Sequence, residues 1–153
     1  MKLTSLALGG LALVGAGLMA TSVFAGAGDD AVKGRQGCMK AHGASFGVFM
    51  PIMKGEKPFD KAAVAAAFAA EDAACADWDK FWAAGAEKGE TLETWAKPEI
   101  WSDRKGFEAA GGVWYNAAQA VKGAADEASF KSAIPGLGDG CKGCHEKFRR
   151  PKA

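Results

Sequence analysis

Two cysteines and a histidine stand close to the C-terminus as Cys141, Cys144 and His145. Residues at positions i, i+3 and i+4 share one face of an α-helix, so both thiols and the imidazole would point the same way. Thiols at this spacing can add to the two vinyl groups of a haem, and Cys-x-x-Cys-His is the attachment pattern of c-type haem. The sequence therefore predicts one covalently bound haem c, with Cys141 and Cys144 as thioether attachments and His145 as the proximal iron ligand.

The Cys-x-x-Cys pair has three other interpretations. A redox dithiol of the thioredoxin type would sit in a βαβ pattern, and none surrounds this pair. A structural zinc site needs four ligands, and the remaining candidates, Cys38, His42 and Cys75, lack paired spacing. A simple disulfide staple is the third interpretation.

Alanine dominates the rest of the chain, and it is the strongest intrinsic helix former. Stretches that alternate β-branched and polar residues are missing. Breaks at glycine and proline delimit four predicted helices, which cover residues 29–49, 60–84, 102–122 and 126–149. We expect Pro51 to end the first helix, Asp60 and Ser102 to cap the second and third, and Pro135-Gly136 to interrupt the fourth. The predicted fold is all-α, an antiparallel up-down four-helix bundle whose C-terminal helix carries the haem attachment.

The N-terminus has the pattern of a cleaved export signal. Lys2 precedes an apolar, Gly-rich stretch, and small residues up to Ala25 suit a signal peptidase. The prediction is a signal peptide over residues 1–25, a single haem domain over 26–153 and a periplasmic location. A retained membrane helix is the alternative.

Charge excludes two classes of partner. The chain has 19 Lys and Arg residues against 18 Asp and Glu residues, and Lys2 is the only charge in the predicted signal. A nearly neutral mature chain without a basic stripe argues against binding nucleic acid or an anionic membrane.

Three segments carry a resemblance to a known family. They are residues 31–41 (AVKGRQGCMKA), 97–103 (KPEIWSD) and 141–149 (CKGCHEKFR). With the attachment site near the C-terminus, the chain resembles the class II cytochromes c, which are the four-helix-bundle cytochromes c′ and their low-spin relatives.

The resemblance implies roles for four further residues. Arg35 and Gln36 match residues at the haem edge, with the arginine paired to a propionate, and a guanidinium fork suits a carboxylate. A solvated arginine is the alternative at position 35. Thr94 matches a second propionate contact, and Arg149 occupies the position beside the proximal histidine.

Met39 matches the residue that faces the distal side of the iron. If its sulfur coordinates, the haem is six-coordinate and low-spin, and the protein is an electron carrier. If Met39 stays off the iron, the haem is five-coordinate and high-spin, and the pocket admits small gases such as NO or CO. We expect the high-spin form, with the low-spin His/Met carrier as the alternative. His42 is a rival distal ligand.

Cys38 and Cys75 remain after haem attachment. In antiparallel neighbouring helices they would lie about 18 and 23 Å from the shared loop, so they can face each other. Export favours a disulfide between them, and two small buried thiols are the alternative.

The expected function is one-electron redox chemistry or small-gas binding without substrate turnover. The expected partners are redox proteins or the gases NO and CO. No membrane partner is expected once the signal has been cleaved. A peroxidase-like enzyme would want a distal histidine and arginine, which Met39 does not supply. A disulfide-stapled structural bundle is a third class. The resemblance also favours a homodimer formed through the first two helices.

Overall fold

The structure is a computed structural model that describes residues 27–151, and within them all regular structure is helical. The predicted signal peptide, residues 1–25, lies outside the described part. None of the helices in residues 27–151 is long and apolar enough to cross a membrane. The elements are α1 (Ala27–Met53), α2 (Lys61–Ala74), α3 (Trp78–Phe81), α4 (Glu99–Ser102), α5 (Arg104–Lys122) and α6 (Glu127–Phe148).

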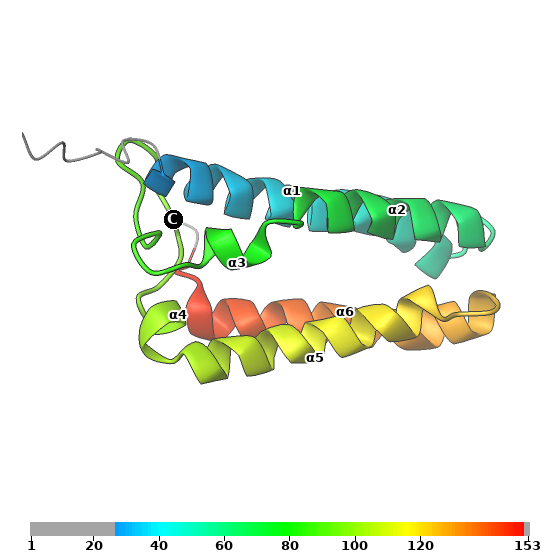
Figure 1. The fold of residues 1–153 in the computed structure, drawn as a ribbon. Helices are drawn as coiled ribbons and strands as arrows, with labels where there is room; N and C mark the ends of the chain where they lie inside the picture. Colours follow the sequence, from blue (N-terminus) through cyan, green and yellow to red (C-terminus); the bar gives the residue numbers. More distant parts are fainter. Residues whose placement is uncertain (1–26, 152–153) are drawn as a thin grey trace, which may run out of the picture.

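The four long helices form two antiparallel pairs (Figure 1). Helix α1 packs mainly on α2, and α5 packs mainly on α6, with fewer contacts between the pairs. The short helices α3 and α4 lie toward the end of the bundle where α1 begins and α6 ends, with α3 against α1 and α4 against α5. The predicted up-down four-helix bundle is confirmed.

Both prolines expected to interrupt helices lie inside them. Helix α1 continues through Pro51 to Met53, and it ends where Gly55 adopts a φ of 75°. Positive φ costs glycine little, and it is a common helix stop. Helix α6 runs unbroken through Pro135, so the predicted break there is wrong. Ile134 and Leu137 are buried in the core on either side of it, and their packing offsets the proline penalty of about 3 kcal/mol.

Two other predicted boundaries also differ. The second helix ends at Ala74, ten residues early, because Cys75 leaves helical geometry and α3 follows after a turn. The residue that caps α5 is Asp103, not Ser102. Its carboxylate accepts a hydrogen bond from the Gly106 amide at 3.0 Å.

Aromatic side chains fill both ends of the bundle. At the end with the α1–α2 and α5–α6 loops, Phe49 contacts Phe68 and Phe130 with ring centroids 5.2 and 5.9 Å apart. At the other end a second cluster contains Trp82, Ile100, Phe107 and Phe148. The first cluster fills the space between the helices at its end of the bundle. The second cluster forms one wall of a cavity.

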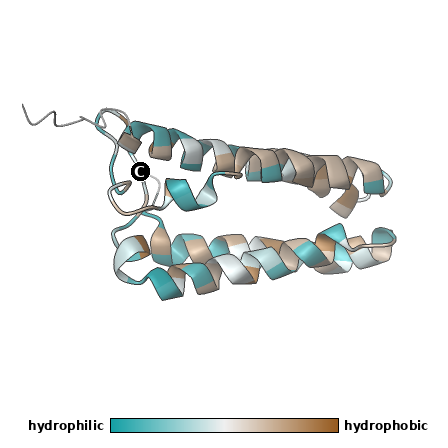
Figure 2. Cartoon of the chain, in the orientation of Figure 1, coloured by the Kyte–Doolittle hydropathy of each residue, from teal (hydrophilic) through white to brown (hydrophobic). Residues whose placement is uncertain are grey.

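Helix α2 has few polar side chains (Figure 2). Six of its alanines are exposed: Ala62, Ala65, Ala66, Ala69, Ala70 and Ala73. Alanine therefore covers much of the outer face of α2, and this face contributes little to the core.

Cys38 of α1 and Cys75 at the end of α2 are bonded to each other, with their Cα atoms 4.8 Å apart. The bond ties the first helix pair together across 37 residues of sequence. Closing a loop of that size removes entropy from the unfolded chain.

We expect the purified haem protein to take no label from a thiol alkylator without reductant and two labels after reduction. Reduction should lower the free energy of unfolding by about 4 kcal/mol, the loop-closure value for this size. Mass spectrometry and urea unfolding measure the two effects. Labelling of both thiols without reductant would contradict the disulfide.

Glycines on α6 differ in what surrounds them. A Cβ added at Gly140 would lie 2.8 Å from the Cα of Trp114, whereas nothing lies within 4 Å of one at Gly138. Gly140, one residue before Cys141, thus lies where the backbone of α5 leaves no room for a side chain on α6.

Gly140→Ala should lower the unfolding free energy by about 1–3 kcal/mol, because the added methyl group forces the two helices apart. Gly138→Ala is the matched control. It should raise that free energy by about 0.5–1 kcal/mol through helix propensity. Urea unfolding of the two proteins should therefore give shifts of opposite sign, and equal shifts would show that this contact does not limit packing.

Candidate haem-binding site

Cys141, Cys144 and His145 lie in the last two turns of α6 and are all partly buried. Burial raises the pKa of both thiols. The negative charge of Glu71 raises that of Cys141 further, and Cys141 does the same for Cys144. Both thiols therefore stay protonated and uncharged in the folded chain before any reaction.

Burial also lowers the pKa of His145, and its neighbours Arg149 and His42 lower it further. An imidazole that resists protonation keeps a nitrogen lone pair free for a metal. Arg149 lies on the next turn and also lines the cavity described below. Arg149 is therefore near enough for its charge to lower the pKa of His145.

A cavity of about 530 Å³ separates α1 from the end of α6, with the α3–α4 region along its side. Small-molecule sites in proteins have volumes of about 300–1,000 Å³. The cavity brings together seven predicted site residues: Arg35, Gln36, Met39, Thr94, Cys144, His145 and Arg149. Cys141 is not among the lining residues, although it lies on the same face of α6.

Arg35 is buried, with 4% of its surface exposed. Its Nη1 donates to the carbonyl oxygens of Phe81 at 2.7 Å and Ala86 at 2.6 Å, and its Nη2 donates to Thr94 Oγ1 at 3.3 Å. The guanidinium also lies 5.0 Å from the centre of the Trp82 ring. Arg35 therefore ties α1 to the segment that follows α3.

One donor of this guanidinium is free. Arg35 Nε is buried and has no hydrogen-bond partner, and no carboxylate in the described chain lies within ion-pair distance of the side chain. Burial accordingly lowers the pKa of Arg35, against the opposing charge of Glu87. A buried cation without an anion, in a cavity that also holds Cys144 and His145, fits a ligand that carries a carboxylate. The residues present therefore fit a haem and its propionates.

The other predicted site residues on α1 are more exposed than Arg35. Gln36 Nε2 donates to the Glu93 carbonyl oxygen at 3.2 Å, which holds the loop against α1. Met39 is 36% exposed and lines the cavity from α1. His42, the predicted rival ligand, does not line the cavity. Its Nδ1 lies 3.0 Å from Glu71 Oε2 instead.

Several aromatic residues that no sequence motif marks as part of the site line the cavity, among them Trp78, Trp82 and Phe107. Trp78 and Phe107 stack with centroids 6.0 Å apart, and Trp82 lies 4.9 Å from Phe107. The i, i+4 spacing of Trp78 and Trp82 was visible in the sequence, but it equally suits a packed core. Trp101 lies beside this wall at the bundle end, and its indole donates to the Ala83 carbonyl oxygen at 3.0 Å.

The family model for cytochrome C′ matches residues 30–149. The chain belongs to the cytochrome c′ family. As a class II c-type cytochrome it carries one covalently bound haem c.

Relatives that bear two different names, cytochrome c′ and cytochrome c-556, are similar to this cytochrome. A cytochrome c′ of Cereibacter sphaeroides is 33% identical over 91% of this chain and 95% of its own. A cytochrome c-556 of Agrobacterium fabrum is 36% identical over 88% of this chain and 89% of its own. Among solved structures, a nitric oxide complex of a point variant of cytochrome c prime from Alcaligenes xylosoxidans has a TM-score of 0.71 and 30% identity, over 82% of this chain and 97% of that one.

Arg35→Met should lower the unfolding free energy of the haem protein by about 3 kcal/mol, because the carbonyl groups of Phe81 and Ala86 lose their donors. Lys33→Met on the same helix is the control. Lys33 is exposed and pairs only with Asp30 at 3.7 Å, so its loss should cost less than about 0.5 kcal/mol. Urea unfolding compares the two, and equal losses would show that the Arg35 network does not hold the loop.

Proposed function

We propose that this cytochrome holds a five-coordinate, high-spin haem in the periplasm, where it binds small uncharged gases such as NO and CO and exchanges single electrons. The observation that carries the proposal is the cavity that places His145 on one side and Met39, on a different helix, on another. The similar nitric oxide complex of cytochrome c prime supports gas binding at such a site.

The chain's own residues have separate tasks in this proposal. Haem, when bound, would supply an iron that changes between ferrous and ferric states and can take a small ligand. Cys141 and Cys144 would hold the group on α6, and His145, whose pKa is lowered, would offer its imidazole to the iron. Helix α6 would therefore carry all three residues that hold the group.

The cavity lining has a polar part and an apolar part. Arg35 and Thr94 offer donors for propionates, and Arg35 Nε is the donor without a partner. Val32, Ile100, Phe107 and Phe148 offer no hydrogen bond. A charged ligand would lose its hydration against them without compensation, whereas NO and CO lose little. The apolar lining therefore selects for small uncharged ligands.

Electron transfer with Met39 as the sixth ligand is the second candidate. The thioether lines the cavity, and the cytochrome c-556 relatives are as similar in sequence as the cytochromes c′.

Catalytic turnover is not part of the proposal. Among the described lining residues the only imidazole is that of His145, so a peroxidase-type acid–base histidine has no candidate in the cavity. His42 is turned to Glu71 on another side of α1.

Export and assembly complete the proposal. Cleavage after Ala25 would release the domain of residues 26–153 into the periplasm. The exposed alanines of α2 suit close approach of a second copy, since small side chains let helices pack tightly. We therefore propose a homodimer through α1 and α2, with redox proteins as electron partners.

The absorption spectrum of the reduced protein tests the spin state. We expect one broad visible band, and CO should bind to the reduced protein. Met39→Ala should leave that band unchanged and raise the CO affinity about tenfold, because the side chain no longer competes for the space. Met50→Ala, on the same helix and away from the cavity, should change neither.

Sharp, separate visible bands in the reduced protein would overturn the high-spin proposal. If Met39→Ala then converted them to one broad band, the methionine sulfur would be identified as the sixth ligand. The protein would in that case be an electron carrier.

A further inference from the structure

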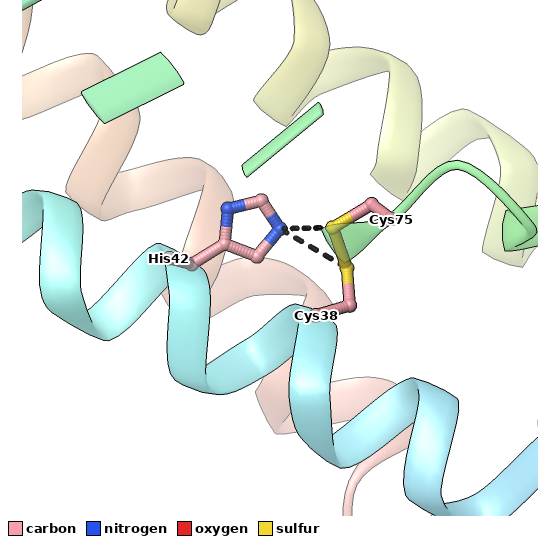
Figure 3. A group of neighbouring side chains, drawn as sticks. All are labelled: Cys38, His42 and Cys75. Atoms are coloured by element: carbon pink, nitrogen blue, oxygen red, sulfur yellow. Dashed lines mark hydrogen bonds between the residues drawn. A yellow bond between two sulfur atoms is a disulfide. The ribbon is translucent and has the colours of Figure 1, made fainter. Parts of the chain in front are cut away.

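A second group of ligand-type side chains lies outside the haem cavity, at the contact between α1 and the end of α2. It consists of Cys38, His42 and Cys75, whose ligand atoms all lie within 4.8 Å of one another (Figure 3). None of the three lines the cavity. His42 turns one ring nitrogen, Nε2, toward both sulfurs, at 3.6 Å from Cys38 and 3.7 Å from Cys75.

The sulfurs of a disulfide offer this nitrogen only a weak hydrogen bond. Bonded sulfurs carry no proton to donate and are weak acceptors. The ring is nevertheless held in place, because it packs edge-on against Trp114 with centroids 4.5 Å apart. The imidazole therefore presents a lone pair or a weakly used donor to the sulfurs.

Glu71 contacts the other ring nitrogen of His42. This contact is a second observation, independent of the two sulfurs. It is 3% exposed, and its Oε2 lies 3.0 Å from His42 Nδ1. Both atoms are buried, and neither makes an aligned hydrogen bond within the described chain, to the other or to a third group. Histidines that ligate metals commonly have a carboxylate at the second ring nitrogen, which fixes the tautomer and turns the first nitrogen to the metal. The buried carboxylate of Glu71 lies at the position that this arrangement requires, 3.0 Å from Nδ1.

We propose that, when the Cys38–Cys75 disulfide is reduced, Cys38, Cys75 and His42 Nε2 bind one Zn²⁺, with Glu71 orienting the imidazole. Zinc–sulfur and zinc–nitrogen bonds at tetrahedral angles place a ligand nitrogen about 3.5 Å from each ligand sulfur. His42 Nε2 is already at nearly that distance from both sulfurs. Only the two sulfurs have to separate.

The chemistry balances with a dithiol reductant. The dithiol gives two electrons and two protons to the Cys38–Cys75 bond and becomes a disulfide itself. Zinc then replaces the two thiol protons, which leave to solvent, and water takes the fourth position. A two-electron oxidant reverses the sequence and releases the metal, so the disulfide and the zinc complex exclude each other.

The donor set selects the ion. Two thiolates and an imidazole suit zinc, whereas calcium and magnesium require oxygen ligands. Cys38 is fully buried, and Cys75 and His42 are partly exposed, so an ion would enter from the side of α2.

Zinc binding by the intact haem protein tests the proposal. Its attachment cysteines are consumed as thioethers, so Cys38 and Cys75 are the only thiols. The protein is reduced anaerobically with a phosphine, which competes weakly for zinc, and dialysed at fixed free Zn²⁺. Elemental analysis then compares zinc with the haem iron. We expect about one zinc per iron after reduction and none in the oxidised protein, with the haem spectrum unchanged.

Variants assign the ligands. His42→Ala should abolish zinc retention at a free zinc concentration that saturates the parent protein. Glu71→Gln should weaken binding about 10- to 100-fold, as loss of a carboxylate behind a ligating histidine does. Glu56→Gln, an exposed glutamate near the first loop, is the matched control and should bind as the parent.

X-ray absorption at the zinc edge of the reduced parent keeps the test independent of whether variants fold. Two sulfur neighbours and one imidazole nitrogen support the site. A zinc-to-iron ratio near zero after reduction would overturn it, and so would equal retention by His42→Ala or a shell without sulfur.

Discussion

Keeping a cavity of about 530 Å³ open between α1 and α6 is the constraint on which the rest of this bundle depends. Packed helices normally leave few voids larger than a water molecule. Here the two helix pairs are joined firmly at one end by Phe49, Phe68 and Phe130. At the other end the aromatic side chains form a wall, and α3 and α4 occupy the connection. The bundle has room for the haem of this family because its helix pairs pack closely at one end and stay apart at the other.

Arg35 closes the side of that cavity. One guanidinium satisfies carbonyl groups of Phe81 and Ala86 and the hydroxyl of Thr94, so the segment after α3 depends on a side chain of α1. Phe81 also packs over Gly34, where any added Cβ would clash with its ring. The neighbours Gly34 and Arg35 thus bring α3 against α1 and hold it there. The buried charge remains one partner short, which suits a propionate.

Helix α1 serves two sites through successive residues. Met39 lines the cavity, while Cys38 faces α2 and bonds to Cys75. Consecutive helix positions point about 100° apart, so a covalent tie and a distal residue can be adjacent in sequence without competing for space. His42 follows Cys38 by one turn and therefore joins the disulfide and Glu71 rather than the cavity.

Local spacing in the sequence was enough to predict the helical class, the four long helices and the attachment face, since i, i+3 and i+4 share a side of any helix. The resemblance to a family, and not spacing, supplied the other predicted residues that line the cavity: Arg35, Gln36, Met39, Thr94 and Arg149. The ends of the helices needed tertiary structure. Pro51 and Pro135 stay helical because packing around them outweighs a local penalty, and α2 stops early where Cys75 turns toward α1. Only the fold could bring Glu71 to His42 and leave Arg35 without an anion, because those contacts join residues far apart in the chain.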